Sequence, residues 1–432
     1  MSSSLKARNA HHEDPLPQLP PLAGRGTEGG IAAPGGEATS LRLMCLLYVL
    51  SISGIFWLAY LPHYMGMMGM APALVGLVFG LRSVVSSLSC PAWAHATDRA
   101  GAALPVLRTQ YALGVIAFAG FALTTSRPAL VLSLLAAAAT AGGALPIVDT
   151  LALRRVGPRG FGAVRAWGSA GYALTSFAAG GVGWFLGSHD RVAVVAPWAQ
   201  AVAALATLCL LLRMPARSPR TAGGGSASDT GRSVGGLWRS ARELPGLRLA
   251  ALLAPAALHW AALAPFHTFL VTLAEVREMP GWVPGAAVGV AVSCEVVVLA
   301  RGDGLLARFS PPTLLLFSFA ISALRWLATS AVTHPVLLVA LQLAHGASFA
   351  AFYVALVALM TEAVPDRLRA TGQSLLYLFV FGMGTAIGAA LSGWIIELTS
   401  VPTLFVCASA GELLAIAVAI PLVLAHRDRS GC

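Results

Sequence analysis

Long apolar segments dominate this sequence and decide what the chain can fold into. Twelve stretches are each apolar over about 20 residues, the length of a helix that crosses a bilayer. In the first half of the chain they cover 41–63, 72–93, 104–125, 128–152, 163–187 and 191–212. In the second half they cover 247–272, 282–300, 311–331, 335–361, 370–396 and 401–425. The sequence therefore predicts an all-α membrane protein with twelve transmembrane helices.

Charged side chains are scarce in this chain, and their scarcity excludes most soluble classes. They make up 11% of the 432 residues, whereas soluble proteins carry about 25%. Hydrophobic residues make up 57%, more than a soluble chain could cover with a polar surface. This composition excludes a disordered chain and an ordinary soluble enzyme. The six cysteines stand singly, without the spacing of a metal site or a disulfide framework, so we expect neither a metal nor a cofactor.

The arginines predict the orientation of the chain in the membrane. Of the 28 Lys and Arg residues, 23 lie on the side of the two termini and the central loop, and three lie on the opposite side. Because basic residues gather in cytoplasmic loops, both termini are expected in the cytoplasm. The net charge of +10 is then a topology signal, and no nucleic-acid partner is expected. We expect a monomer embedded in the lipid bilayer of a plasma or inner membrane.

The chain divides into two halves of six predicted helices each. A polar tail with several prolines precedes the first span, and a basic, Gly- and Ser-rich segment separates the sixth span from the seventh. Such compositions favour disordered tails and flexible linkers. The predicted boundaries are a cytoplasmic tail over 1–40, a first half over 41–212, a linker over 213–246, a second half over 247–425 and a cytoplasmic tail over 426–432.

A short repeat relates the two halves to each other. Arg165-Ala-Trp-Gly168 opens the fifth span, and Arg369-Ala-Thr-Gly372 opens the eleventh span 204 residues later. Both helices are rich in glycine, which lets helix backbones approach closely in a membrane. Two pseudo-symmetric six-helix halves are typical of carriers that work by alternating access.

The loop between the second and third spans carries a motif that resembles the signature of the major facilitator superfamily. Ala94-His-Ala-Thr-Asp98-Arg99-Ala-Gly101 is similar to the family's G-x-x-x-D-R-x-G, with Ala94 in place of the first glycine. The resemblance implies the twelve-helix carrier fold of that superfamily. It also implies that Asp98, Arg99 and Gly101 form part of a cytoplasmic gate.

Further motifs resemble the branch of that superfamily (MFS_1-like) that holds the 3-phenylpropionate permeases and is related to the lactose and nucleoside permeases. They are Pro146-Ile-Val-Asp149, Val164-Arg165-Ala-Trp167-Gly168-Ser-Ala-Gly171-Tyr172, Ala323-Leu-Arg325-Trp326, Gln342-Leu-Ala-His345-Gly-Ala-Ser-Phe349 and Arg369-Ala-Thr-Gly-Gln373. The resemblance covers residues 41–425 and adds residues of the two glycine-rich helices to the expected gate. These added residues are Arg165, Trp167, Gly168 and Arg369.

Three ionisable residues on successive spans are candidates for proton coupling. Glu295 lies deep in the eighth span, Arg325 in the ninth and His345 in the middle of the tenth. A charged side chain at a helix centre costs roughly 2.5–3.5 kcal/mol, which implies a partner or a water-filled cavity. Apolar surroundings favour a protonated carboxyl and an approaching guanidinium favours its ionised form, so the set suits a proton relay. The trio resembles the coupling set of lactose permease, and a static Glu–Arg bridge beside a core histidine is the alternative.

Two further charged sites are candidates for binding a solute. Asp149 and Arg165 lie near the ends of consecutive spans, where they either hold a ligand or form a gating bridge. Arg82 is another cation within a span, and it either receives a carboxylate or pairs with an aspartate.

Uncharged residues complete the predicted binding set. Gln342 and Tyr353 flank His345 on the tenth span. Trp57 belongs to an aromatic series on the first span, which lines either the cavity or the membrane interface.

Together these features predict a secondary carrier that moves a small organic solute with protons by rocking of its halves. The arginines Arg82 and Arg325 favour an organic anion as the solute. The alternatives are a sugar or nucleoside carrier of the same fold, and a receptor or scaffold that does not transport. The sequence has no H-E-x-x-H or G-x-S-x-G motif, so we expect no enzyme and no catalytic residues.

Overall fold

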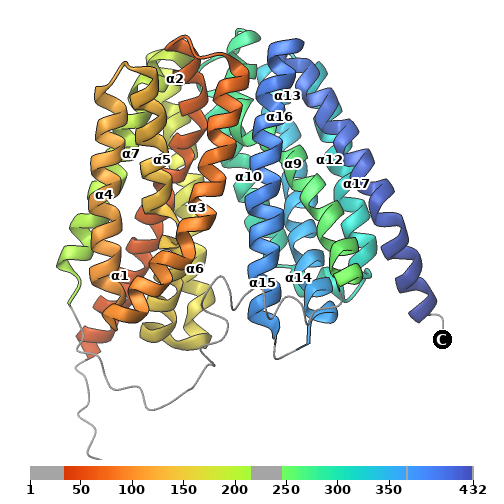
Figure 1. Ribbon diagram of the computed structural model, residues 1–432, viewed down its shortest axis with the longest axis horizontal. Helices are drawn as coiled ribbons and strands as arrows, with labels where there is room; N and C mark the ends of the chain where they lie inside the picture. Colours follow the sequence, from red (N-terminus) through yellow and green to blue (C-terminus); the bar gives the residue numbers. More distant parts are fainter. Residues whose placement is uncertain (1–33, 216–245, 366–367, 431–432) are drawn as a thin grey trace, which may run out of the picture.

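The computed structural model describes residues 34–215, 246–365 and 368–430, and every element assigned within these ranges is helical. The first half contains α1 (Pro34–Ser53), η1 (Gly54–Tyr60), α2 (Leu61–Met67), α3 (Pro72–Ala100), α4 (Ala103–Leu123), α5 (Arg127–Ala141), α6 (Ala144–Leu186) and α7 (His189–Arg213). The second half contains α9 (Gly246–Val276), α10 (Val283–Leu299), α11 (Gly302–Leu306), α12 (Pro311–Ala331), α13 (Pro335–Leu341), η3 (Gln342–Ala344), η4 (Gly346–Ala350), α14 (Ala351–Ala363), α15 (Arg369–Leu376), η6 (Tyr377–Gly384), α16 (Thr385–Leu398) and α17 (Val401–Ser430). Figure 1 shows the two groups of helices side by side.

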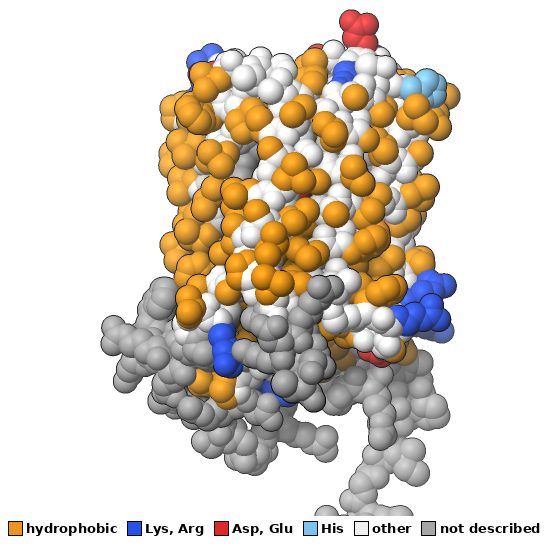
Figure 2. Space-filling view, turned by 90° about the vertical axis from the view of Figure 1, so that its right-hand side faces the viewer, with side chains coloured by type: hydrophobic (Ala, Val, Ile, Leu, Met, Phe, Trp, Pro, Cys, Tyr) orange, Lys and Arg blue, Asp and Glu red, His pale blue; other side chains and the backbone are white. Residues whose placement is uncertain are grey.

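Ten helical segments in the described ranges are long and apolar enough to cross a membrane. They are Leu41–Met67, Pro72–Ala100, Ala103–Leu123, Arg127–Gly157, His189–Arg213, Gly246–Val276, Pro311–Ala331, Pro335–Ala363, Thr371–Leu398 and Val401–Leu424. The two other predicted spans are the part of α6 that follows Gly157, and α10, which has 17 residues. Figure 2 shows hydrophobic side chains covering the flank of the molecule between charged groups at its two ends. The predicted all-α membrane fold is confirmed.

The helices extend beyond the predicted spans at both ends of the chain. α1 begins at Pro34, inside the predicted tail, because proline is well tolerated at the first position of a helix. α17 continues to Ser430, so most of the predicted C-terminal tail is helical. Residues 1–33 of the predicted N-terminal tail and residues 216–245 of the predicted linker lie outside the described ranges.

A break at Gly157 divides α6 into the end of the fourth span and the fifth span. Gly157 has φ 71° and ψ 173°, a conformation that only glycine adopts readily. The helix therefore changes direction there, between Asp149 and Arg165. This break allows residues at the ends of two consecutive spans to face each other.

Glycines hold the two halves in close contact toward one end of the bundle. We call the end at which α2 finishes at Met67 the outer end, following the predicted orientation. A Cβ on Gly76 of α3 would lie 2.8 Å from the Cα of Gly393 in α16, and a Cβ on Gly183 of α6 would overlap the backbone of Gly281. The predicted role of the glycines in close helix packing thus holds at Gly183.

Polar contacts join the same outer surfaces of the halves. Nε2 of His189 lies 2.8 Å from the carbonyl oxygen of Met279. The backbone N–H of Ala73, in the first turn of α3, donates to the Glu397 carboxylate at 3.0 Å. A carboxylate at a helix N-terminus is favourable because the N–H groups there have no partner within the helix. The outer side of the bundle is therefore closed.

Candidate functional site

The predicted coupling residues Glu295, Arg325 and His345 meet in one cluster in the second half. Nη1 of Arg325 lies 2.9 Å from Nδ1 of His345, and Nε2 of His345 lies 3.9 Å from the Glu295 carboxylate. Arg325 and His345 are buried, whereas a fifth of the Glu295 side chain is exposed. The cluster therefore runs from the interior of the half at Arg325 to a more open position at Glu295.

An irregular helix places His345 beside Glu295. His345 lies between the 3₁₀ turn η3 and the π-helical turn η4, and such turns often mark functional sites in helices. A Cβ on the next residue, Gly346, would lie 3.0 Å from the backbone carbon of Cys294. The glycine therefore lets η4 approach α10 at the position of Glu295.

The contacts of Arg325 determine which nitrogen of His345 carries a proton. A guanidinium has only donors, so His345 accepts at Nδ1 and carries its proton at Nε2. Nη1 of Arg325 also donates to Oε1 of Gln342 at 3.1 Å, and the Gln342 amide donates to the Leu338 carbonyl. In this state His345 is neutral and presents an N–H toward Glu295.

Arg165 of the opposite half is a cation whose charge acts on the mostly buried Glu295. Nε of Arg165 also lies 3.5 Å from Oδ1 of Asp149. The hydroxyl of Tyr48 donates to the same Asp149 oxygen at 2.5 Å, and the Arg165 guanidinium lies over the Tyr48 ring. The structure thus brings the predicted pair Asp149 and Arg165 together and places it across the interface between the halves from Glu295.

Aromatic rings form one wall of the site. The ring of Phe349 stacks on His345 with centroids 5.3 Å apart, and Tyr353 follows Phe349 at 6.3 Å. Trp260 of α9 contacts both Phe349 and Phe381. Tyr353 is half-buried, and the charges of Asp149 and Arg165 act on it.

Other predicted binding residues lie away from this cluster or are already occupied. Gln342 is buried and committed to Arg325 and a backbone carbonyl. Trp57 of η1 is half-buried and packs against Phe56 and Tyr60.

Arg82 lines a separate cavity of about 250 Å³ within the first half. Gln110, Tyr111 and Gln200 line the same cavity from α4 and α7. Arg82 and Arg325 therefore do not converge on one place. The prediction of an organic anion loses the paired arginines on which it was based.

The predicted gate residues occupy several environments. Asp98 and Arg99 are exposed at the end of α3, and Gly101 ends that helix with φ 61°, a conformation suited to glycine. Trp167 is 52% exposed, and Gly168 packs against Ile52 of α1. Arg369 is exposed at the start of α15.

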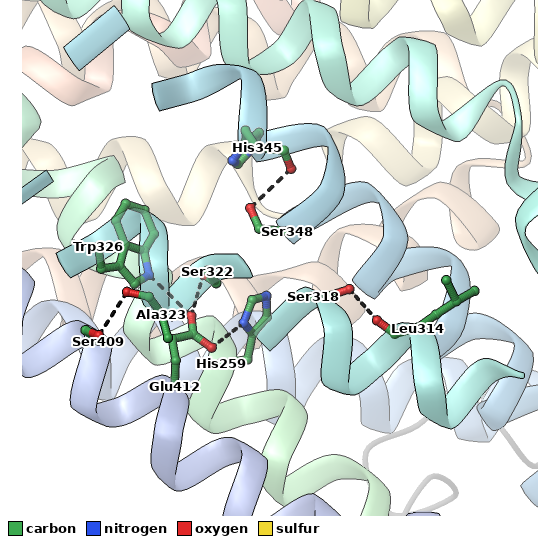
Figure 3. A network of polar contacts seen from close by, with 10 residues as sticks. All are labelled: His259, Leu314, Ser318, Ser322, Ala323, Trp326, His345, Ser348, Ser409 and Glu412. Atoms are coloured by element: carbon green, nitrogen blue, oxygen red, sulfur yellow. Dashed lines mark hydrogen bonds and ion pairs between the residues drawn. The ribbon is translucent and has the colours of Figure 1, made fainter. Parts of the chain in front are cut away.

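Figure 3 shows a second buried polar network, around Glu412 and His259, which the sequence did not predict. Oε2 of Glu412 is 2.7 Å from Nδ1 of His259, and Oε1 accepts from Ser322 at 2.7 Å and from the indole of Trp326 at 3.3 Å. Glu412 and His259 are fully buried. The network joins α9, α12 and α17, which are far apart in sequence, so spacing along the chain does not reveal it.

The chain is similar to known transporters over most of its length. It matches the MFS_1 like family over residues 39–407. It is 27% identical over 362 residues to the maltose permease of Geobacillus stearothermophilus, which covers 83% of this chain and 87% of that protein.

Solved structures share the same fold. The nucleoside transporter NupG, as its D323A mutant, superposes with a TM-score of 0.79 and 17% identity, covering 88% of this chain and 99% of that one. A bacterial homologue of the human lysosomal transporter Spinster, in an inward-facing and unoccupied conformation, gives a TM-score of 0.69 and 13% identity, covering 90% and 96% of the two chains. The chain therefore belongs to the MFS_1 like family and is a multi-pass membrane transporter of the major facilitator superfamily, not an enzyme.

Proposed function

We propose that this transporter moves a neutral, hydroxyl-bearing ring compound of the sugar or nucleoside class together with protons, and that Glu295 binds the coupling proton. The main observation in support of this proposal is that Glu295 lies between His345 and Arg165. His345 presents an N–H to it from within its own half, and the charge of Arg165 acts on it from the other half.

Alternating access gives this position a mechanistic role. The outer sides of the halves are in contact, which corresponds to an inward-facing arrangement. Rocking of the halves to open the outer side changes the distance between Arg165 and Glu295. When Arg165 is close, it favours the ionised carboxylate and release of the proton, and when it is distant, the apolar surroundings favour protonation.

The charges and rings at the site favour a neutral solute. Because Arg165 is matched by Asp149, this pair does not offer an unpaired cation to a solute carboxylate. A paired carboxylate and guanidinium offer acceptors and donors to hydroxyl groups. The half-buried rings of Trp260, Phe349 and Tyr353 offer flat apolar faces to a sugar or nucleobase ring.

The names of the similar transporters agree with this class of solute. The maltose permease is named for a sugar and NupG for nucleosides. Gating by Asp98, Arg99, Gly101, Trp167, Gly168 and Arg369, a monomeric state, cytoplasmic termini and a plasma or inner membrane are parts of the same proposal.

Counterflow in proteoliposomes tests the class of solute. The purified protein is reconstituted, loaded with unlabelled solute and supplied outside with labelled maltose, uridine or 3-phenylpropionate. We expect maltose or uridine to accumulate transiently and 3-phenylpropionate to stay outside. Exchange of 3-phenylpropionate alone would establish the organic anion, and exchange of none of the three by folded protein would favour a scaffold.

A matched pair of variants tests the coupling role. Glu295→Gln keeps the size of the side chain and its capacity for hydrogen bonding but cannot ionise, so exchange continues and accumulation driven by a pH gradient stops. Glu362→Gln removes an exposed carboxylate of α14 and leaves both activities intact. Accumulation by Glu295→Gln would overturn the assignment.

A further inference from the structure

We propose that Glu412 is the permanent counter-ion of Arg325 and that its negative charge sets the proton affinity of Glu295. This inference rests on the proposed function, in which Glu295 binds the coupling proton. It concerns a carboxylate of α17 that contacts the Trp326 ring on which Arg325 lies.

Arg325 needs a counter-charge that its direct contacts do not supply. Arg325 is 2% exposed, and its Nη1 contacts the uncharged acceptors of Gln342 and His345. Nε and Nη2 have no hydrogen-bond partner in the described part of the chain. A buried, uncompensated charge is strongly unfavourable, so a nearby anion must stabilise this cation.

Glu412 supplies the negative charge near Arg325, and the ring of Trp326 lies in contact with both. The guanidinium carbon of Arg325 lies 4.0 Å from the centre of the Trp326 ring, and the indole N–H of the same ring donates to Glu412. Within the described ranges, Glu412 is the carboxylate whose charge stabilises Arg325. The cation therefore lies over the face of the indole, and the carboxylate lies at its N–H edge.

The hydrogen bonds of Glu412 favour its ionised form. Oε1 accepts from the hydroxyl of Ser322 and from the indole of Trp326, and a carboxylate is an acceptor at both oxygens. Oε2 faces Nδ1 of His259, whose ring is enclosed by Phe319 and Phe352. Nε2 of His259 is buried and has no hydrogen-bond partner among the residues that the structure describes, so a charged imidazole would leave an N–H there unpaired. A neutral His259 that donates from Nδ1 to an ionised Glu412 avoids that cost.

With the charge of Arg325 neutralised by Glu412, Glu295 is not needed as a counter-ion and can bind and release a proton. Arg325 is balanced by Glu412, and its influence reaches Glu295 through the oriented ring of His345. Among the described residues, the groups that face Glu295 are Arg165 and Tyr172 of α6 and His345. Those that act on His345 are Arg325, His267 and His259. Removing the charge of Glu412 leaves Arg325 uncompensated, and the ionised form of Glu295 then becomes its counter-charge.

Infrared spectroscopy of the purified, solute-free protein tests this role, because the carbonyl band of a protonated carboxyl disappears as it ionises. The wild type is expected to show a titrating buried carboxyl that Glu295→Gln removes. Glu412→Gln is expected to keep this band and to lower its midpoint by about one pH unit, because an uncompensated positive charge in a protein interior favours ionisation of a carboxyl. Ser409→Ala, which removes a bond from α17 to the Ala323 carbonyl, leaves the midpoint unchanged.

A variant in which the charges of Arg325 and Glu412 are both removed is expected to restore the wild-type titration of Glu295. In the double variant Arg325→Gln/Glu412→Gln both charges are absent, so the Glu295 midpoint returns toward the wild-type value. Glu412→Asp keeps the negative charge and is therefore expected to keep the wild-type midpoint. If Glu412→Gln does not fold, the double variant is compared with the wild type instead. An unchanged midpoint in Glu412→Gln, loss of the titrating band in that variant, or a double variant no closer to wild type would overturn the inference. Because no solute is used, failure of the transport assays is a separate result.

Discussion

Asp149 and Arg165 lie on opposite sides of the break at Gly157 in α6, and their side chains approach within 3.5 Å. The pair holds Arg165 at the interface between the halves, where its charge acts on Glu295. Asp149 therefore competes with Glu295 for one guanidinium. This competition leads to the first prediction.

Asp149→Asn is expected to reduce solute exchange by at least about tenfold, because Arg165 then pairs firmly with Glu295 and ties the halves together. The double variant Asp149→Asn/Arg165→Gln recovers part of the exchange rate but does not accumulate solute. Counterflow measures both. Since about a third of each side chain is exposed, at 35% and 31%, each single change alters the free energy of unfolding by less than about 1 kcal/mol. Additive loss in the double variant would contradict the competition.

Replacing His345 separates its two hydrogen bonds from its ring chemistry. Glutamine can accept from Arg325 and donate toward Glu295, so His345→Gln is expected to keep most of the transport activity. His345→Ala leaves a buried guanidinium N–H unpaired, which costs about 1–3 kcal/mol of stability, and it stops coupled accumulation. Thermal unfolding and pH-driven uptake are measured for both variants. Equal loss in the two variants would show that the imidazole itself carries the proton.

Closure of the outer side depends on a glycine that faces the other half. A side chain at Gly183 overlaps the backbone of Gly281, so Gly183→Leu holds the outer side open and stops transport. Gly181→Leu is the matched control, because no atom lies within 4 Å of a Cβ at that position.

Spin labels measure this opening directly. Thr125 and Thr399 are exposed residues at the outer ends of the two halves. In a cysteine-free background, labels at these positions are expected to lie farther apart in Gly183→Leu than in the parent or in Gly181→Leu. Identical distance distributions in all three proteins would show that closure of the outer side does not depend on Gly183.

Arg277 stabilises the end of a neighbouring helix. Its Nη1 donates to the Thr329 carbonyl at 2.9 Å, and its guanidinium also contacts the carbonyls of Ser330 and Val332, where α12 ends. Arg277→Gln is expected to lower the free energy of unfolding by about 1–3 kcal/mol, because helix-terminal carbonyls lose their donors. Arg127→Gln, which removes an exposed bond to the Met68 carbonyl, is expected to have a smaller effect. Thermal unfolding in detergent compares the two.

The fold was largely predictable from the sequence because a bilayer imposes one length on every apolar helix. The boundaries of α12 coincide with the predicted span, and the outer glycine contacts follow from small residues in α6. The break at Gly157 also has a sequence cause, but glycines are too frequent in this chain for one of them to identify a break in advance. The hydrophobic pattern of the sequence therefore predicts the positions of the helices better than the positions of their bends.

The candidate site was predictable in its residues and less so in its pairings. Glu295, Arg325 and His345 were identified because ionisable groups are unfavourable within spans, and they do meet. The sequence suggested Arg325 as the cation of Glu295, whereas Arg165 fills that position and Arg325 is balanced by Glu412. Pairing across helices depends on helix rotation and on contact between the halves, which hydrophobic patterning does not specify. For the same reason Arg82 was grouped with a site from which the structure separates it.

Proton movement that accompanies solute entry tests the central claim most directly. Wild-type and Glu295→Gln proteoliposomes are suspended in weakly buffered medium without a pH gradient, and the solute identified by counterflow is added outside. Coupled entry predicts that the external pH rises with the wild type and stays constant with Glu295→Gln, although both exchange solute. An equal rise with both proteins, or solute entry through the wild type without any rise, would contradict the assignment of Glu295 as the site of the coupling proton.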